Sequence, residues 1–192
     1  MRVGLISTCY NDIHAVGDSV RSILDDLPGD TVQVGDVSYS WRWLILDVGS
    51  TDGTWEELCA VTTGRSNVLA VQLRGSRGRL VRGAARGIAA VLEQPDIFIH
   101  AIDSDVVYNP GVIPLILSEF EKNGRRPIAG DQYFVICATD YWRVGGYDPV
   151  QVEEDFKIYG KLERAGMSVT SRVLGIVKEH RNVAQGWKQG GS

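Results

Sequence analysis

Short apolar runs alternate with segments of helical spacing over roughly the first 120 residues of the chain. The runs contain few polar residues, which is typical of strands that are buried on both faces of a sheet. The four predicted strands are residues 3–8, 43–46, 67–73 and 97–102. Between them, apolar residues recur at steps of three and four, which predicts helices over 12–27, from Thr54 onward and over 80–92. This alternation predicts an α/β fold with a mostly parallel sheet and helices on both of its faces.

The rest of the chain predicts a smaller part in which strands and helices are mixed. The expected elements are a strand near 133–136, a helix over 153–165 and short strands near 169–174 and 176–178. A length of 192 residues suits one domain. We expect a single domain over residues 1–182 and a flexible tail over 183–192, which is rich in glycine and glutamine.

Composition narrows the class of protein. Apolar residues make up 44% and charged residues 23% of the chain, which excludes a disordered or collagen-like protein. The net charge of −4 gives no reason to expect nucleic acid or an anionic membrane as a partner. Cys9, Cys59 and Cys137 lie far apart, so we expect reduced thiols and a cytoplasmic protein. We expect neither a signal peptide nor a transmembrane segment, because acids interrupt the longest apolar stretch.

Polar or charged residues stand directly after each of the four predicted strands. They are the segment from Thr8 to Asn11, Asp47, Arg74 and the segment from Asp103 to Asp105. In open α/β sheets, ligands bind beyond the carboxyl ends of the strands. We therefore expect a ligand site at that edge of the sheet.

Asp103 and Asp105 flank Ser104 after the fourth predicted strand. Residues two apart in an extended segment point to the same side, so the two carboxylates converge. A cation between them relieves their repulsion, and Mg²⁺ and Mn²⁺ accept hard oxygen ligands of this kind. The alternative is a loop whose acids are solvated or cap the following helix.

A second candidate site is the arginine-rich segment 58–92, which carries six arginines and no acidic residue. Because the whole chain sums to −4, the remaining residues sum to −10. Guanidinium groups near the N–H groups of a helix start favour phosphate, and the alternative is a solvated cationic face. Arg82 and Arg86 share a helix face, so their spacing does not choose between them.

Four other features have a chemical or a structural interpretation. The acids at 153–155 open the last helix, where the helix dipole favours them and where a carboxylate can also serve as general base. His180 follows the last predicted strand, where an imidazole can complete a metal site. His100 lies within a buried strand and is expected to be a hydrogen-bonded core histidine. Thr54 and Glu57 have the spacing of a capping box.

In this order, the motifs resemble those of inverting family 2 glycosyltransferases with the GT-A fold, which have a Rossmann-like nucleotide-binding sheet. The similar segments are 7–11 (T-x-Y-N), 47–54 (D-D-G-S-T-D-G-T with one mismatch), 103–105 (D-x-D), 144–148 (the glycine loop), 153–156 (the E-D motif) and His180, where many GT-A enzymes carry a metal-binding histidine. The resemblance covers nearly the whole chain, from about residue 3 to about residue 180.

The resemblance implies that residues 1–105 form the nucleotide-sugar-binding half. Thr8 and Asp47 would help to hold the nucleoside, with Tyr10 near the base. Asp103 would face the ribose or the metal. A basic neighbour such as Arg82 would add positive charge beside the diphosphate.

For residues 106–182 the resemblance implies the acceptor and catalytic half, which adjoins the metal site at the end of the first half. Asp105 would bind Mn²⁺ or Mg²⁺ on the diphosphate, and His180 would complete the metal site. The ion acts as a Lewis acid toward the departing nucleoside diphosphate. Asp155 would be the base that deprotonates an acceptor hydroxyl as it attacks the anomeric carbon and inverts it.

One residue departs from the family pattern, because Val48 replaces the second acid of the D-D pair. That acid often contacts the base, so we expect a UDP-sugar as first choice and a GDP-sugar as second. The chain is short for the family, so recognition of the acceptor, a hydroxyl-bearing glycan, lipid, protein or small molecule, falls to the region after Glu121, to the tail or to another subunit of a homo-oligomer.

Two other functions are less compatible with the sequence. A sugar-phosphate nucleotidyltransferase would need a glycine-rich loop with Arg and Lys after the first strand, and the segment from Thr8 to Asn11 does not supply one. A non-catalytic nucleotide-sugar-binding relative would not require a base, so Asp103, Asp105 and Asp155 together favour the enzyme.

Overall fold

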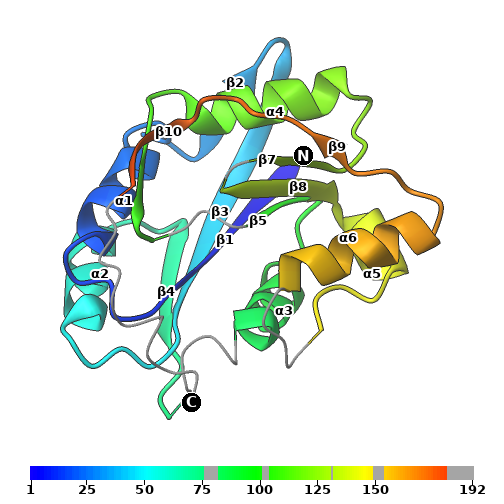
Figure 1. Cartoon of the computed structure of the whole chain (residues 1–192). Coiled ribbons are helices and arrows are strands. Elements are labelled where there is room, and N and C mark those ends of the chain that lie inside the picture. Colours follow the sequence, from blue (N-terminus) through cyan, green and yellow to red (C-terminus); the bar gives the residue numbers. More distant parts are fainter. Residues whose placement is uncertain (76–81, 101–103, 131, 149–153, 181–192) are drawn as a thin grey trace.

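A computed structural model describes the chain except for residues 76–81, 101–103, 131, 149–153 and 181–192 (Figure 1). The side chains at 82–83, 154–156 and 180 also lie outside the described part. The strands are β1 (Arg2–Cys9), β2 (Thr31–Val34), β3 (Val37–Asp47), β4 (Val68–Gln72), β5 (Ile97–His100), β6 (Val106–Tyr108), β7 (Ile128–Gly130), β8 (Tyr133–Cys137), β9 (Thr170–Ser171) and β10 (Val177–His180). The helices are α1 (Val16–Leu24), α2 (Thr54–Thr62), α3 (Arg82–Glu93), α4 (Val112–Lys122), α5 (Ala138–Arg143) and α6 (Glu154–Arg164).

The central sheet has the order β2–β3–β1–β5–β8–β7–β9, and β4 also pairs with β3. The neighbours β4, β3, β1 and β5 are parallel, whereas β8 is antiparallel to both β5 and β7. β3 is long enough to pair with β2 through Val37–Ser40 and with β4 through Trp43–Asp47. The four predicted strands form the parallel part of the sheet, as expected.

Helices cover both faces of the sheet, as the alternation of elements predicted (Figure 1). On one face α1, α2 and α4 pack into a core that includes Val20, Leu58 and Ile116. On the other face α3, α5 and α6 pack into a second core, to which α3 contributes the small residues Ala85, Ala89 and Ala90. Consecutive residues of β1 alternate between the two cores, because side chains along a strand point to opposite faces.

The start of α2 corrects the predicted capping box. The Thr54 hydroxyl does not receive the Glu57 N–H; it donates to Asp52 (2.6 Å) and accepts the N–H of Asp12 (2.7 Å). The N–H of Glu57 instead donates to the carbonyl of Gly53 (3.1 Å). Asp52 takes the capping role by accepting the Thr54 N–H (3.0 Å). The capping side chain therefore lies two residues earlier than the spacing indicated.

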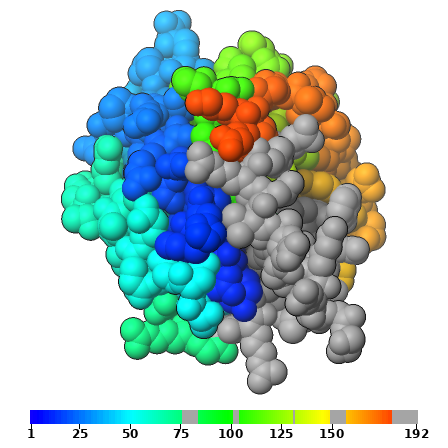
Figure 2. All heavy atoms as spheres, turned by 60° about the vertical axis from the view of Figure 1, so that its left-hand side comes forward, coloured from blue at the N-terminus to red at the C-terminus, as the bar shows by residue number. Residues whose placement is uncertain are grey.

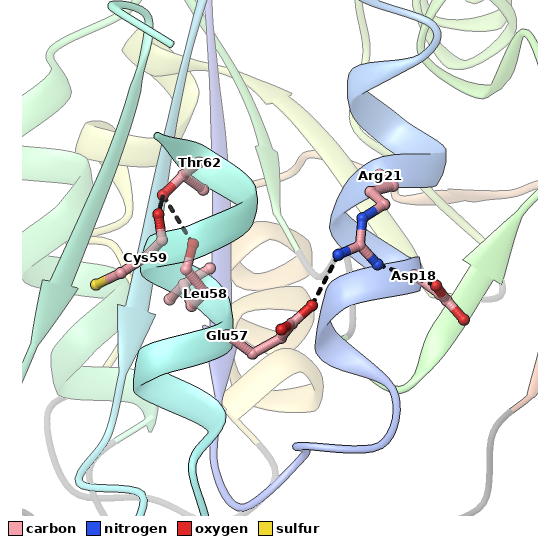
Figure 3. A network of polar contacts seen from close by, with 6 residues as sticks. All are labelled: Asp18, Arg21, Glu57, Leu58, Cys59 and Thr62. Carbon is pink, nitrogen blue, oxygen red and sulfur yellow. Dashed lines mark hydrogen bonds and ion pairs between the residues drawn. The ribbon is translucent and has the colours of Figure 1, made fainter. Parts of the chain in front are cut away.

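Glu57 connects α2 to α1. Its carboxylate accepts a hydrogen bond from Arg21 (2.8 Å), which also pairs with Asp18 (3.2 Å) in its own helix (Figure 3). The Arg21 side chain is 54% exposed, so these pairs contribute little to stability. They connect α2 to α1 at the surface. The helix α1 begins at Val16, four residues later than the start predicted at Asp12.

The three cysteines and the lengths of the helices bear on two of the expectations from the sequence. Cys9 is buried, Cys59 and Cys137 are partly exposed, and each is a thiol rather than half of a disulfide, as predicted. Burial raises the pKa of the Cys137 thiol, which disfavours the reactive thiolate. Within the described residues, no helix has the length and apolarity that crossing a membrane requires.

Gly130, the last residue of β7, is expected to tolerate no side chain. A Cβ at this position would overlap the carbonyl oxygen of Arg172 and the ring of Tyr133. Because the oxygen belongs to the backbone, Gly130→Ala must displace the segment around β9, and we expect unfolding free energy to fall by about 1–3 kcal/mol. Denaturant unfolding measures this. Gly87→Ala in α3, where a Cβ meets nothing within 4 Å, is the control and should be neutral or stabilising.

Candidate active site

The carboxyl ends of β1, β3 and β4 are aligned at one edge of the sheet. The strand register places Cys9 opposite Asp47, and Asp47 opposite Gln72. In β5, the neighbour of β1 on its other side, His100 is opposite Ile6. The loops that follow these strands therefore start side by side, which is the arrangement that the sequence predicted for a ligand site.

Asp47 is fully buried at this edge. Its carboxylate accepts hydrogen bonds from the backbone N–H (3.1 Å) and the hydroxyl of Ser50, and from the amide of Gln72 (3.0 Å). The Gln72 oxygen in turn accepts a hydrogen bond from Arg74 (3.1 Å). Asp47 therefore braces the loop after β3 against β4, and its predicted contact with a nucleoside stays a prediction.

The loops after β1 and β3 are held together by reciprocal hydrogen bonds. The N–H of Asn11 donates to the Ser50 hydroxyl (2.9 Å), and the Asn11 side-chain oxygen accepts the N–H of Thr51 (2.9 Å). Asn11 has φ of 53°, a left-handed conformation that asparagine adopts more readily than most residues. These bonds give the edge a fixed shape before any ligand binds.

Thr8 and Tyr10, the other residues predicted to lie near the nucleoside, are both at this edge. Thr8 is 2% exposed, and its hydroxyl has no hydrogen-bond partner in the described part of the chain. A buried hydroxyl without a partner is costly, so a ligand group that bonds to it would be stabilised. Tyr10 is half-buried and packs against the core that contains Val48.

The second half of the D-x-D segment continues the same edge. Ser104 is buried, and its hydroxyl donates a hydrogen bond to the carboxylate of Asp12 in the loop after β1. Asp105 is half-buried, and no hydrogen bond or ion pair engages its carboxylate within the residues that the structure describes. Asp103 lies outside the described residues.

His180 is brought to the D-x-D segment by its strand. β10 pairs with β6 in a separate two-stranded sheet, in which the backbone of His180 is opposite Val106. Val106 directly follows Asp105 in the chain. Figure 2 shows the orange-red β10 segment lying against the green segment that includes β6. Residues that are far apart in the sequence therefore meet at the predicted metal site.

The donor set at this position fits a divalent ion. Carboxylate oxygens and an imidazole suit Mn²⁺, and carboxylates with water suit Mg²⁺. Among the described residues alone there is no group of three or more metal-ligating side chains. Asp103, which is predicted to face the ribose or the metal, and the side chain of the predicted ligand His180 are outside that set. The free carboxylate of Asp105 is the described part of the site.

The structure distinguishes the environments of Arg82 and Arg86 only in part. Arg86 is 2% exposed, and its guanidinium carbon lies 5.6 Å from the ring centre of Tyr147, a cation–π contact. It therefore points into the protein beneath the glycine loop. Arg82 is the first residue of α3, and its side chain lies outside the described part. Its predicted contact with the diphosphate is untested.

His100 is buried, as predicted, but the described part of the chain does not supply the expected hydrogen bond. Neither ring nitrogen has a partner among the described residues. Its ring stacks on Tyr141 (centres 5.4 Å apart) and meets the edge of Tyr147 (5.0 Å). Burial and the nearby charge of Arg86 hold its pKa well below the ordinary value of 6.5, so the ring is neutral. The imidazole serves here as an aromatic core residue.

The predicted base lies at the start of α6, which begins at Glu154. Asp155 is in its first turn, and its side chain is outside the described part. The glycine loop before it is fixed by Lys161, which donates to the carbonyl of Gly146 (2.8 Å) and to Asp148 (2.7 Å). Lys161 was not predicted from the sequence, where it has the ordinary appearance of a basic residue in the last turn of a helix.

Comparisons with known proteins agree with this arrangement. A search of curated proteins finds no match to the sequence. Among solved structures, the chain is similar to the mannosyltransferase PcManGT from Pyrobaculum calidifontis in complex with GDP-Man and Mn²⁺, at 13% identity and a TM-score of 0.75, over 93% of this chain and 56% of that one. It is also similar to S. aureus TarS 1-349 in complex with UDP-GlcNAc, at 12% identity and a TM-score of 0.67, over 96% of this chain and 62% of that one.

A third similar structure is glucosyl-3-phosphoglycerate synthase from Mycobacterium tuberculosis with Mn²⁺, UDP and glucosyl-3-phosphoglycerate. The identity is 16% and the TM-score 0.70, over 94% of this chain and 72% of that one. The chain thus spans only about three fifths of the length of the first two relatives, at 56% and 62%. At these identities the likeness shows the fold, which is the GT-A fold. The sequence profile of glycosyl transferase family 2 matches residues 5–167, most of the chain. The chain therefore belongs to glycosyl transferase family 2.

Proposed function

We propose that the protein transfers a sugar from a nucleoside-diphosphate sugar to an acceptor hydroxyl, with inversion at the anomeric carbon and with the help of a divalent metal ion. The observation that carries this proposal is the β6–β10 pairing, in which the backbone of His180 is opposite the residue after Asp105. This pairing supports a metal site shared by the two residues, because a carboxylate and an imidazole from distant parts of the chain start from neighbouring backbone positions. Family membership supports the same conclusion.

In this proposal each residue at the edge has a task. Thr8, Tyr10, Asp47 and Asp103 bind the nucleoside, and the unpartnered Thr8 hydroxyl is a ready hydrogen-bonding group for it. Asp105 and His180 hold Mn²⁺ or Mg²⁺. When bound, the ion supplies Lewis-acid neutralisation of the charge on the departing diphosphate.

The acceptor half of the proposal rests on Asp155 and Arg82. Asp155 accepts the proton of the acceptor hydroxyl as the oxygen attacks the anomeric carbon. Arg82, at the positive end of α3, adds favourable charge beside the phosphates. The acceptor is a hydroxyl-bearing glycan, lipid, protein or small molecule, and a second subunit of a homo-oligomer is one source of its binding site. A cytoplasmic location stays a prediction.

The donor is proposed to be a UDP-sugar first and a GDP-sugar second. Similar structures contain either nucleotide: UDP-GlcNAc in TarS, UDP in the phosphoglycerate synthase and GDP-Man in PcManGT. In this chain Val48 is fully buried in the core, so it presents no polar group to a base. Its hydrophobic side chain leaves base selection to neighbouring polar groups.

Thermal unfolding with UDP or GDP, with and without Mn²⁺, tests this function. We expect one nucleoside diphosphate to raise Tm by about 5 to 10 °C at roughly a hundredfold excess over Kd, and only when Mn²⁺ is present. UMP, which lacks the second phosphate, is the control and should have a much smaller effect. If neither diphosphate stabilises the protein with any divalent metal, the proposed function is wrong.

A further inference from the structure

Asp12, which matches none of the family motifs, is the centre of a buried hydrogen-bond network at the active-site edge. The residue is 5% exposed. Its carboxylate oxygen Oδ2 accepts the backbone N–H of Tyr10 (3.2 Å) and the hydroxyl of Ser104. Ser104 stands between the two acids of the D-x-D segment, so Asp12 directly contacts the middle of that motif.

Asp12 is itself fixed by its backbone. Its N–H donates to the hydroxyl of Thr54 at the start of α2 (2.7 Å). Its carbonyl accepts the N–H groups of Ala15 (2.9 Å) and Val16 (2.8 Å) at the start of α1. Since both sides of the residue are anchored, Asp12 cannot follow Ser104 if that segment moves. Through Asp12, the hydrogen bond therefore holds Ser104 at a fixed position relative to the starts of α1 and α2.

Ser104 and Asp105 differ in exposure, and this difference indicates what the Ser104–Asp12 hydrogen bond does. Ser104 is 6% exposed and directed into the protein, whereas the neighbouring Asp105 is half-buried with its carboxylate unengaged by described residues. Holding Ser104 inward keeps Asp105 facing the ligand edge. A hydrogen bond from a hydroxyl to a carboxylate is stronger than one between neutral groups. The Ser104–Asp12 bond can therefore hold the D-x-D segment against the mutual repulsion of its two acids.

We propose that Asp12 is a positioning residue for the metal site: through Ser104 it fixes the D-x-D segment so that Asp105 is already in place when the metal-bound nucleotide arrives. This inference rests on the proposed function, which supplies the metal. It assigns a role to a residue that acts through its hydrogen bond to Ser104.

The first test compares Mn²⁺ affinity in Asp12→Ala and in the wild type, measured by electron paramagnetic resonance of free Mn²⁺ with UDP or GDP present. We expect affinity to fall roughly tenfold to a hundredfold, the usual effect of losing a group that orients a metal ligand. Asp12→Asn keeps the shape and one acceptor oxygen for Ser104, so its affinity should be intermediate. This second variant keeps the test valid if the alanine variant does not fold.

Asp26→Ala is the matched control. Asp26 also links distant segments through its carboxylate, by accepting the N–H groups of Gly111 (2.6 Å) and Val112 (2.7 Å) at the start of α4. Its removal should lower Tm to a similar extent without changing Mn²⁺ affinity. An equal loss of Mn²⁺ affinity in the Asp12 and Asp26 variants would show a merely structural role and overturn the inference.

The Ser104→Ala variant tests the route of the effect. We expect it to weaken Mn²⁺ binding as Asp12→Ala does, and the double variant to be no weaker than the single ones, because both remove the same bond. Fully additive losses would contradict the inference.

Amide hydrogen exchange separates this inference from the proposed function. In metal-free protein, Asp12→Asn should accelerate exchange at the described residues 104–108, whereas Asp26→Ala should not. If wild-type protein binds no nucleoside diphosphate, the proposed function fails, and the exchange comparison still decides whether Asp12 holds the segment. Unchanged exchange at residues 104–108 in Asp12→Asn overturns the inference and leaves the proposed function standing.

Discussion

Asp155→Asn is expected to abolish sugar transfer while leaving donor binding intact. Asparagine has the shape of aspartate but cannot take the proton of the acceptor hydroxyl. General-base catalysis contributes typically about 10²- to 10⁴-fold, so kcat should fall by that order. Transfer is measured as release of nucleoside diphosphate with the donor in excess, and calorimetric titration of the donor nucleotide with Mn²⁺ should give an unchanged Kd.

Glu163→Gln is the control for Asp155. Glu163 is an exposed acid near the other end of the same helix, so its charge is removed from α6 without touching the first turn. We expect wild-type transfer in this variant. An undiminished kcat in Asp155→Asn would show that Asp155 is not the base. The next candidates would then be the neighbouring acids Glu153 and Glu154.

Asp105→Ala is expected to remove the dependence of nucleotide binding on Mn²⁺. The carboxylate of Asp105 is the described ligand of the proposed site and has no described protein partner to compete for it. Removing a direct ligand should weaken Mn²⁺ binding by more than about a hundredfold, the upper end for residues that merely orient ligands. Calorimetric titration of UDP and GDP with and without Mn²⁺ measures the loss.

Asp36→Ala provides the comparison for Asp105. Asp36 is an exposed acid in the turn between β2 and β3, away from the loops that follow the parallel strands. Its replacement should leave the Mn²⁺ effect on nucleotide binding unchanged. A wild-type Mn²⁺ effect in Asp105→Ala would show that another residue carries the metal.

The parallel sheet was predictable because its strands are buried on both faces and therefore read as continuous apolar runs. The first half of β3 was missed for the opposite reason. There Tyr39 and Trp41 are buried while Ser38 and Ser40 are exposed, so the segment alternates as a half-buried strand does. That alternation was a usable signal, but the prediction began the strand at Trp43, where the apolar run starts.

The candidate site was predictable only where short motifs carry the chemistry. Asp12, Gln72 and Lys161 hold the loops in place through hydrogen bonds to residues that are distant in the sequence or lie in other loops. No local spacing marks such partners, because the pairs form only after the strands have aligned. Thr54 was misjudged for the same reason, because its hydroxyl accepts the N–H of Asp12, which is distant in the sequence.

The β6–β10 ladder also bears on the order in which the molecule folds. β1 and β3 pair across fewer than forty residues, whereas Val106 and His180 are more than seventy residues apart. Closing the longer loop costs more chain entropy and is rewarded by only a short two-stranded ladder. The β1–β3 pairs are therefore expected to form before the β6–β10 ladder. This order predicts a stage in which β1 and β3 are already paired while the proposed metal site is still incomplete.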